Sequence, residues 1–413
     1  MPVLPGKLAG QVNAPAPPSA NTFSVLLVTL SIQALVSMGV LAVPAMGPAM
    51  AQAMGVSPAL LGAYIGLVYV GAMVASLMSA PLVLRYGALR TSQLALLGCA
   101  VGLALPALWP SLPAAVIGAL LTGLGYGPVT PASSHLLARS TPPERASLVF
   151  SVKQTGVPLG GVMAGAIVPP IVQAAGAQVA LLSVVAACIV CMFAAQPFRA
   201  ALDEDRDPAR PLRMGSFMGG LKLVGSEPAL KQLATMSFVF SIAQMCLSTY
   251  LVTYLHGSLG YTLVAAGGLL SASQAGGVVG RIAWGWMADR WLDPYRMLAI
   301  LAAAMAVCAG GAALMQADTP ATLVLVLLVA FGASAIGWNG VYLAEVARRS
   351  PPGMAGVATS GTLAFTFFGV VVGPPLFGAL SNVAGSYRAG YAAVAVPTAV
   401  CALVLWRLGR RAR

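Results

Sequence analysis

The chain has 413 residues, of which 59% are hydrophobic and only 8% are charged, and its formal net charge is +12. A soluble domain carries about 25% charged residues, so this composition excludes a soluble globular protein, a disulfide-rich secreted scaffold, a coiled coil and a disordered chain. The positive charge does not indicate nucleic-acid binding, because the cations are scattered singly between apolar runs. The length allows about twelve membrane spans of ~20 residues each.

Two further features of composition bear on source and chemistry. Arg outnumbers Lys by 18 to 4, and Ala, Gly and Leu are abundant, a bias that indicates a GC-rich bacterial source. The six cysteines all lie in apolar stretches, and the pair Cys188 and Cys191 has no second pair of ligands for a metal. We therefore interpret the cysteines as small buried hydrophobes and expect neither a metal site nor a cofactor.

In chain order, residues 1–22 contain five prolines and one charge. They predict a flexible cytoplasmic tail rather than a signal peptide, which needs a basic segment directly before its apolar core. A six-helix N-terminal half (23–197), a polar cytoplasmic linker (198–228), a six-helix C-terminal half (229–408) and a short cytoplasmic tail (409–413) follow. The apolar runs predict twelve spans, near 23–46, 60–80, 91–108, 112–138, 146–170, 175–197, 229–255, 262–288, 295–316, 320–346, 355–380 and 387–408.

The charges alternate from one predicted loop to the next. Lys and Arg are enriched in cytoplasmic loops, and here they follow every even-numbered span, whereas the loops after odd-numbered spans are nearly neutral. We therefore expect both termini on the cytoplasmic side of a bacterial inner membrane. The cations on which this prediction depends include Arg85, Arg90, Arg139, Arg145, Arg290, Arg296, Arg348, Arg349, Arg407 and Arg410.

The two halves resemble each other in sequence. The segment Arg139-Ser-Thr-Pro-Pro143 follows the fourth span, and Arg348-Arg-Ser-Pro-Pro352 follows the tenth. Six-span repeats of this kind belong to transporters in which two halves move about a central site. The predicted fold is thus an all-α polytopic membrane protein with twelve transmembrane helices, arranged as two six-helix repeats around a central cavity.

A motif between the eighth and ninth spans connects the chain to a known family. The segment Gly285-Trp-Met-Ala-Asp289-Arg290 resembles the G-x-x-x-D-R signature of the major facilitator superfamily. The first-half copy ends in Leu84-Arg85 and lacks both the Gly and the Asp of the signature. With the span count and the linker, the resemblance covers the whole chain and implies secondary active transport by alternating access.

A narrower resemblance concerns the fifth and tenth spans. The segments Ser151-Val-Lys153-Gln154-Thr155 and Gly337-Trp338-Asn339 are similar to the cyanate-permease-like branch of that superfamily. This branch implies a small organic or inorganic anion as substrate. Uptake of an anion into a cell with a negative interior is opposed by ~2.3 kcal/mol per charge per 100 mV, so uptake would require a proton that moves with it or an exchanged anion.

Lys153 and Arg281 are the strongest candidates for the substrate site. Each lies about seven residues from the predicted cytoplasmic end of its span, at a depth of roughly 10 Å. A cation at that depth usually faces a polar cavity, and the resemblance implies that the fifth and eighth spans meet between the halves. The functional interpretation is an anion site. The alternative is that both side chains extend to the lipid headgroups.

Other polar residues on predicted spans are candidates for substrate contact, or else for hydrogen bonds between helices. Gly156, Gly160, Gly161 and Gly165 instead predict close helix packing. The remaining substrate-site candidates are Gln33, Tyr126, Gln154, Gln244, Tyr250, Gln274, Trp338, Asn339 and Tyr342.

Gating and proton coupling have their own candidates. Glu345 is the only carboxylate near a span interior, and it predicts either a gate with Arg290 or Arg281 or a proton carrier. His135 is a candidate proton shuttle, because histidine is the residue type that most often gains and loses a proton near neutral pH, although a histidine hydrogen-bonded within the bundle is the alternative. Further gating candidates are Arg85, Asp289, Arg290 and Arg348.

Two other functions remain open from the sequence. A drug or cation exporter of the same fold would be supported by a membrane-embedded Asp or Glu in the first half, and none is present. A non-transporting receptor or sensor would need a signalling domain larger than the linker of about 30 residues. No set of residues suggests an enzyme. The expected partners are an anionic small molecule, the lipid bilayer and a co-transported proton, and the expected state is a monomer.

Overall fold

The computed structural model describes residues 22–142, 145–212, 217–351 and 354–411. Apart from Thr22, the predicted N-terminal tail lies outside the described residues. Within them the chain forms helices and no strand, which confirms the all-α prediction. Eleven helical segments of the described residues, some of them formed by consecutive helices, are long and apolar enough to cross a membrane. Helices suit such a sequence because each backbone polar group is satisfied within its own segment.

The N-terminal half begins with a long helix and contains two places where one predicted span is divided. The fourth predicted span consists of α5 and α6, and the fifth begins with α7 and continues into α8. Its elements are α1 (Thr22–Ala45), α2 (Gly47–Met54), η1 (Pro58–Leu60), α3 (Leu61–Tyr86), α4 (Ala88–Leu108), α5 (Leu112–Tyr126), α6 (Val129–Ser140), α7 (Ala146–Gln154) and α8 (Gly156–Ala194).

Helix α8 changes direction at Gly176. This residue has φ = 86°, a left-handed conformation that glycine adopts without the steric cost of a Cβ atom. The apolar segment around it, Val149–Leu202, has 54 residues, more than twice the ~20 that cross a bilayer. The break lies where the sequence predicts the fifth span to end and the sixth to begin.

The linker and the C-terminal half complete the chain. The linker contains two short helices at its start and one amphipathic helix, α10, at its end. These elements are η3 (Gln196–Phe198), α9 (Arg199–Leu202), α10 (Phe217–Ser226), α11 (Pro228–Leu259), α12 (Leu263–Arg290), α13 (Pro294–Leu314), α14 (Ala321–Gly337), α15 (Asn339–Arg349), α16 (Ala355–Val383) and α17 (Tyr387–Arg411).

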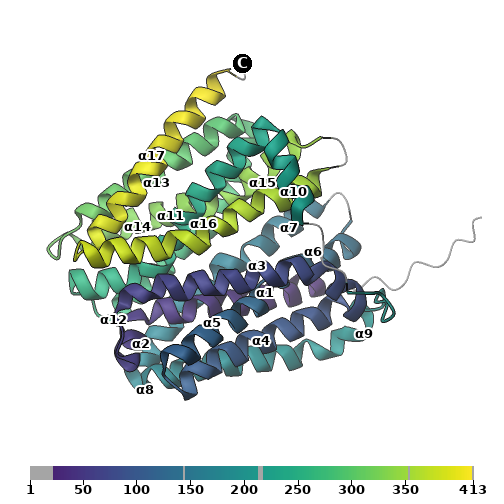
Figure 1. Cartoon of the computed structure of the whole chain (residues 1–413), viewed down its shortest axis with the longest axis horizontal. Helices are drawn as coiled ribbons and strands as arrows, with labels where there is room; N and C mark the ends of the chain where they lie inside the picture. The colour runs from purple at the N-terminus through teal and green to yellow at the C-terminus, as the bar shows by residue number, and fades with distance from the viewer. Residues whose placement is uncertain (1–21, 143–144, 213–216, 352–353, 412–413) are drawn as a thin grey trace, which may run out of the picture.

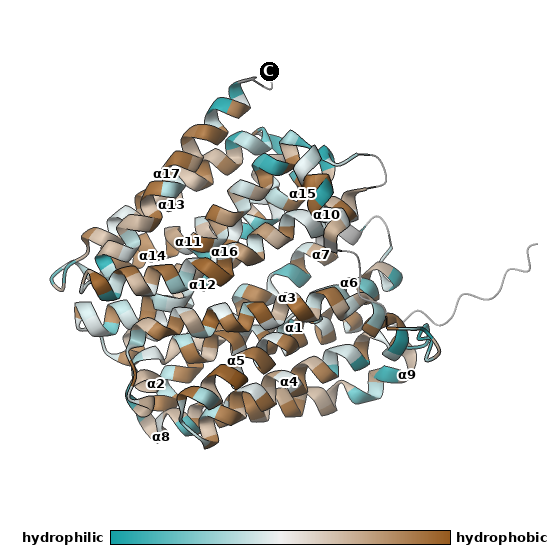
Figure 2. Ribbon diagram, viewed as in Figure 1, coloured by the Kyte–Doolittle hydropathy of each residue, from teal (hydrophilic) through white to brown (hydrophobic). Residues whose placement is uncertain are grey.

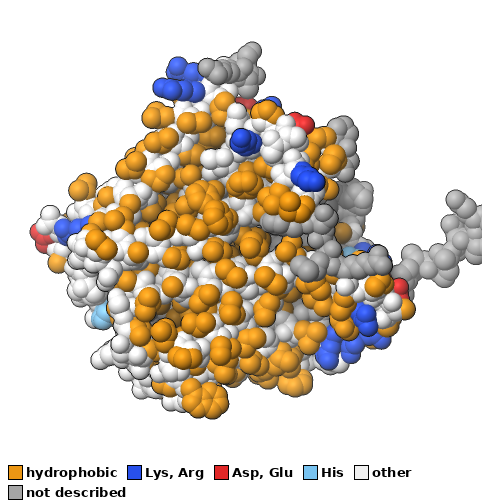
Figure 3. All heavy atoms as spheres, in the orientation of Figure 1, with side chains coloured by type: hydrophobic (Ala, Val, Ile, Leu, Met, Phe, Trp, Pro, Cys, Tyr) orange, Lys and Arg blue, Asp and Glu red, His pale blue; other side chains and the backbone are white. Residues whose placement is uncertain are grey.

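The two halves lie side by side, with their helices running in broadly the same direction (Figure 1). We call the end of the bundle that carries α9 and α10 the linker end, and the end that carries α2 and η1 the far end. Hydrophobic residues cover the middle of the bundle in Figure 2, and Figure 3 shows Lys and Arg mainly near its margins. Large apolar side chains such as Phe193 and Val307 are exposed, as expected for a surface that contacts lipid.

At the linker end, a carboxylate from the linker caps a helix of the N-terminal half. The buried Asp203 accepts hydrogen bonds from the backbone N–H groups of Leu89 (2.7 Å) and Arg90 (3.0 Å), in the first turn of α4. Gly87 precedes this helix with φ = 96°, and a Cβ atom there would collide with the Asp203 carboxylate. In the C-terminal half, the residue directly before α13, Asp293, caps that helix with its own side chain. The linker thus supplies a cap that the sequence before α4 lacks.

Replacement of Asp203 by Ala is expected to lower the free energy of unfolding by about 1 kcal/mol, the usual cost of losing an N-cap. Burial raises the pKa of the Asp203 carboxyl, while its bonds to Leu89 and Arg90 oppose that shift. Asp203→Asn, which keeps one acceptor and removes the buried charge, is therefore expected to cost less. Thermal unfolding of both variants measures this, with the exposed Glu204→Gln as control. An equal loss of stability in all three variants would show that Asp203 does not stabilise the protein by capping α4.

Glycines allow helices of the two halves to approach closely. A Cβ atom on Gly161 of α8 would lie 2.5 Å from Cδ of Gln274 on α12, and one on Gly165 would lie 2.5 Å from the carbonyl oxygen of Gly267. Within the N-terminal half, Gly160 packs against the α1 backbone at Ala34. The prediction of close helix packing at these glycines is confirmed.

Candidate functional site

A cavity lies between the halves, near the middle of the bundle. It is narrow in this state, with about 20 Å³ open to the centre of a water-sized sphere, and its wall combines side chains from α1, α3, α5 and α8 with others from α11, α12 and α14. Neutral polar groups and apolar groups share the wall. The polar ones are Ser37, Tyr69, Tyr126, Gln244, Ser248 and Gln274, and the apolar ones are Val40, Leu41, Val157, Met245 and Ile336.

The predicted candidates Tyr126, Gln244 and Gln274 lie in this wall. Sequence reasoning missed Ser37, Tyr69, Ser248 and Met245. A signal for two of them was present, since Ser37 follows Gln33 by four residues and Ser248 follows Gln244 by four, and residues four apart share a helix face.

Hydrogen bonds hold the amides of the cavity in place. Gln274 donates to the Ser248 hydroxyl at 3.1 Å. Gln244 accepts from the indole N–H of Trp338 at 3.0 Å and from the amide of Asn339 at 3.5 Å. Trp338 therefore supports Gln244, which lines the cavity, and does not line the cavity itself. It is fully buried and packs edge-on against Phe240, with ring centroids 5.4 Å apart.

Gln33 contributes to the same region from α1. Its amide oxygen accepts from the Thr130 hydroxyl at 3.0 Å, and its amide nitrogen donates to Ser37 at 3.4 Å. Gln33 is fully buried, so its present role is to connect α1 to α6 and to orient the cavity residue Ser37. Tyr342 is likewise fully buried, and its ring packs against Trp338 at 5.1 Å.

Lys153 is the last-turn cation of α7, and it is fully buried. In the part of the chain that the structure describes, its one contact of this kind is a long hydrogen bond of 3.5 Å from Nζ to the side-chain oxygen of Gln154. Among the described residues, no carboxylate lies within 4 Å of it. The alternative in which Lys153 extends to the lipid headgroups does not describe this side chain.

Arg281, on α12, binds the backbone of Gln154, the residue next to Lys153. Its Nη1 donates to the backbone oxygen of Gln154 at 2.7 Å, and its Nε donates to the backbone oxygen of Ile336 at 3.1 Å. The first carbonyl is available because its helical partner would be Pro158, which has no N–H group. The second belongs to the last turn of α14, where carbonyls lack helical partners.

Lys153 and Arg281 thus meet at Gln154, between the two halves. In the part of the chain that the structure describes, neither forms an ion pair. Ile336, whose carbonyl Arg281 binds, and Val157, three residues after Gln154, also line the cavity. The arrangement places two uncompensated cations next to a cavity whose own wall is uncharged.

Tyr250, which was predicted to contact substrate, does not line the central cavity. It is fully buried at the far end, where its hydroxyl accepts from the N–H of Gly62 at 2.8 Å. Carbonyl oxygens of Ala59 (2.7 Å) and Pro374 (3.1 Å) lie within reach of its proton. Gly62 and Ala59 belong to the N-terminal half, so Tyr250 connects the halves and closes the far end.

Tyr250→Phe is expected to weaken this closure by about 1 kcal/mol, the net value of a typical buried hydrogen bond. The population with an open far end should then rise about fivefold. The measurement is the maleimide labelling rate of a cysteine at Thr253, which is buried one turn further along α11, with and without Tyr250→Phe. An unchanged rate would show that the hydroxyl does not hold the far end closed.

The predicted gating residues are not joined in the way expected. Glu345 is buried and pairs with Arg348 (2.5 Å) and Arg349 (2.8 Å) of its own helix, not with Arg290 or Arg281. Local i+3 and i+4 spacing favours these partners. Arg290 instead lies over the ring of Trp286, 5.1 Å from its centroid.

Two further gating candidates lie at the linker end. Arg85 donates to the backbone oxygen of Arg210 at 3.1 Å, so it holds the linker. The side chain of Asp289 lies outside the described residues.

His135 binds the linker and does not face the cavity. Its Nε2 lies 2.6 Å from a carboxylate oxygen of Asp205, and Arg139 binds the other oxygen of that carboxylate at 2.6 Å and Glu204 at 3.0 Å. These contacts attach the first part of the linker to the N-terminal half. A proton shuttle through the cavity is not supported by this position.

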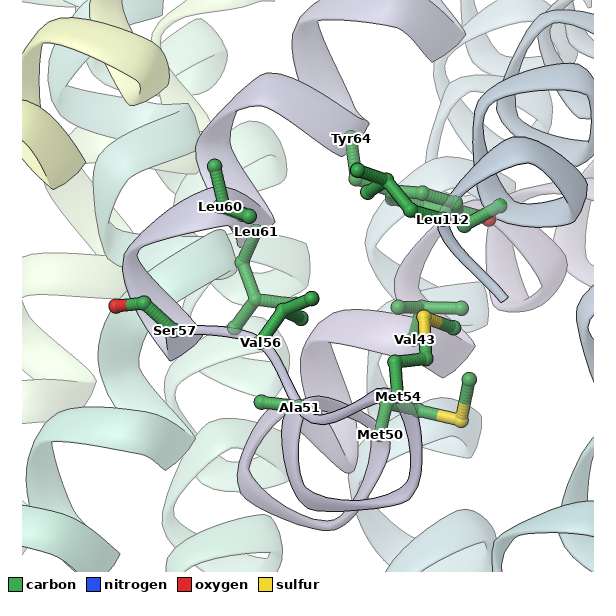
Figure 4. A pocket seen from close by; sticks show the side chains of 11 residues that line it. Val43, Met50, Ala51, Met54, Val56, Ser57, Leu60, Leu61, Tyr64 and Leu112 are labelled. Atoms are coloured by element: carbon green, nitrogen blue, oxygen red, sulfur yellow. The ribbon is translucent and has the colours of Figure 1, made fainter. Parts of the chain in front are cut away.

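A second hollow, at the far end, is apolar. Figure 4 shows Val43, Met50 and Met54 facing Leu61 across it, with Tyr64 and Leu112 at its margin. About 50 Å³ of it is open to the centre of a water-sized sphere. Its wall has neither an amide nor a charged side chain, whereas the central cavity has two glutamine amides in its wall and the guanidinium of Arg281 beside it, so the central cavity remains the candidate site.

Comparison with known proteins identifies the family. A model of the Major Facilitator Superfamily matches residues 25–362. The chain belongs to the Major Facilitator Superfamily. The family and the multi-pass membrane fold predicted from the sequence are confirmed, while the narrower resemblance to the cyanate-permease-like branch stays a prediction.

Relatives and solved structures of the superfamily resemble this chain to different extents. Uncharacterized MFS-type transporters of two Mycobacterium tuberculosis strains, CDC 1551 / Oshkosh and H37Rv, are each 26% identical over 296 residues, which is 70% of this chain and 63% of the relative. The chain thus matches less than two thirds of their length.

A bacterial homologue of the human lysosomal transporter Spinster, inward-facing and unoccupied, superposes with a TM-score of 0.75 at 16% identity, covering 96% of this chain and 98% of the homologue. A peptide transporter POT in complex with sulfate gives 0.75 at 15% identity and 94% coverage of both chains. At such identities the likeness shows the fold.

Proposed function

We propose that this superfamily member is a secondary active transporter that moves a small anion across the membrane by alternating access. The observation that carries the proposal is the pair Lys153 and Arg281, which lie together between the halves with no carboxylate partner in the described part of the chain. A buried charge without a counter-charge is costly, so such a pair is best explained by a substrate that supplies the negative charge.

The polar groups of the cavity wall suit a small substrate. In this state about 20 Å³ is open to the centre of a water-sized sphere, which is room for roughly one water, so a substrate enters only when the halves move apart. The amides of Gln244 and Gln274 and the hydroxyls of Tyr69 and Tyr126 would bind the uncharged part of such a molecule, and Lys153 with Arg281 would bind its anionic end.

The proposal includes an orientation. We propose twelve crossings, with the segment Val149–Leu202 crossing twice by turning at Gly176, and with the linker end in the cytoplasm of a bacterial cell. The supporting argument is the enrichment of Lys and Arg at that end. In this orientation the Tyr250 contact closes the extracellular side, and the substrate would reach the cavity from the cytoplasm.

A thermal-shift screen of the purified protein tests the function. A ligand that binds only the folded state raises its apparent stability by RT ln(1 + [L]/Kd), about 2.7 kcal/mol at 100 times Kd. We expect at least one of formate, acetate, lactate, benzoate, nitrate and sulfate to stabilise the protein, at constant ionic strength. A matched panel of choline, tetraethylammonium and ethidium is the control. Stabilisation by the cations alone would contradict the proposal.

A further inference from the structure

The ammonium group of Lys153 lies in an environment that disfavours a permanent positive charge. It is fully buried, its single hydrogen bond is 3.5 Å long, and the guanidinium of Arg281 binds the backbone of the same residue, Gln154. Arg281 has two backbone carbonyls as partners and cannot lose its proton. Among the described residues, Lys153 has neither a backbone carbonyl nor a carboxylate as partner, and the cost of a buried lysine charge is relieved either by an anion or by release of the proton.

Among the described residues, the helices packed around Lys153 offer no free carboxylate that could neutralise its charge. Helix α1 contains no titratable residue within Thr22–Ala45. On α6, His135 and Arg139 are bound to the linker carboxylates. Arg281 of α12 has the tyrosines of the cavity as its electrostatic neighbours, and Glu345 of α15 is bound by two arginines. Among the described residues of this region, the charge that a proton from solvent can add or remove is thus that of Lys153.

We propose that Lys153 is the proton-coupling group of this transporter, neutral in the empty cavity and protonated when an anion is bound. This inference rests on the proposed function and names its coupling ion. The anion and one proton enter together: the amine takes H⁺ from the aqueous phase that reaches the cavity, and the resulting ammonium pairs with the anion. On the opposite side the anion leaves, and the proton follows it.

The charges balance in each state. The empty site carries +1 from Arg281 alone. The loaded site carries +1 from Arg281, +1 from Lys153 and −1 from the anion, again +1. Reorientation of the empty and the loaded protein therefore moves the same charge, and one cycle transfers no net charge. The membrane potential would not oppose uptake of a monovalent anion by this route.

The test measures protons taken up when the anion binds. The probe is whichever monovalent anion of the thermal-shift panel stabilises the protein most, added to the intact protein in weakly buffered detergent solution with a pH-indicator dye. We expect uptake of about one proton per anion at a pH where the empty site is neutral, and an affinity that weakens about tenfold per pH unit above that point.

Lys153→Arg is the diagnostic variant, because arginine keeps the charge but stays protonated. Its anion affinity is expected to be independent of pH between 6 and 9, with no proton uptake. Wild-type binding that takes up no proton and does not depend on pH would overturn the coupling role and leave the proposed function intact. Proton uptake that persists in Lys153→Arg would assign it to another group. If no anion in the panel binds at any pH, the proposed function itself fails.

Discussion

Replacement of Lys153 by Ala is expected to abolish measurable anion binding. Removal of one partner of a buried charge pair costs about 2–5 kcal/mol, which corresponds to a loss of affinity of roughly 30-fold to several thousand-fold. Lys153 makes no ion pair that its removal would break, so the empty variant is expected to fold and to melt close to the wild type. Equilibrium binding of the stabilising anion, beside a melting curve without it, measures both quantities.

Two substitutions at the same position serve as controls. Lys153→Met keeps most of the volume and removes the charge, so it should behave like the Ala variant in binding. Lys153→Arg should retain part of the affinity, because a planar guanidinium replaces a compact ammonium imperfectly. If Lys153→Met binds the anion as tightly as the wild type, then Lys153 does not compensate the substrate, and Arg281 becomes the principal cation of the site.

Gly267→Ala is expected to destabilise the contact between the two halves strongly for so small a change. Its new Cβ atom would lie 2.6 Å from the carbonyl oxygen of Gly165 and would collide with Pro169, both on α8. Backbone atoms cannot yield as a flexible side chain does, so α8 and α12 must separate. Overpacking of this kind costs about 1–3 kcal/mol. Thermal unfolding and labelling of a cysteine at Thr253 would record lower stability and a more open far end.

The neighbouring residue provides a matched control. A Cβ atom on Gly268 would meet no heavy atom within 4 Å. Gly268→Ala is therefore expected to be neutral or slightly stabilising, since Ala favours a helix over Gly by about 1 kcal/mol. Similar destabilisation by the two substitutions would show that the contact between α8 and α12 at Gly165 does not determine the stability of this state.

Much of the site was predictable, but its contacts were not. Glycines in the fifth span indicated close packing, and the buried cations Lys153 and Arg281 stood out because few charges lie in the spans. Tyr250 was assigned to the cavity because its span lines the cavity in the superfamily. Only the position of η1 beside Tyr250 shows that its hydroxyl instead connects the halves. The partners of Glu345 were expected on distant segments, whereas local helix spacing decided them.

The sequence by itself determined the membrane-spanning helical architecture of this protein, because lipid requires long apolar helices and the signature motif is local in the chain. It also determined which few residues would carry charge inside that architecture. Only the tertiary structure decided what those charges meet. Pro158 frees the carbonyl of Gln154, yet α12 must cross α8 at that level for Arg281 to occupy it. Likewise, Asp203 completes α4 only because the linker folds back over Gly87. Contacts between residues far apart in sequence depend on how the helices cross, and no local pattern of the chain encodes that geometry.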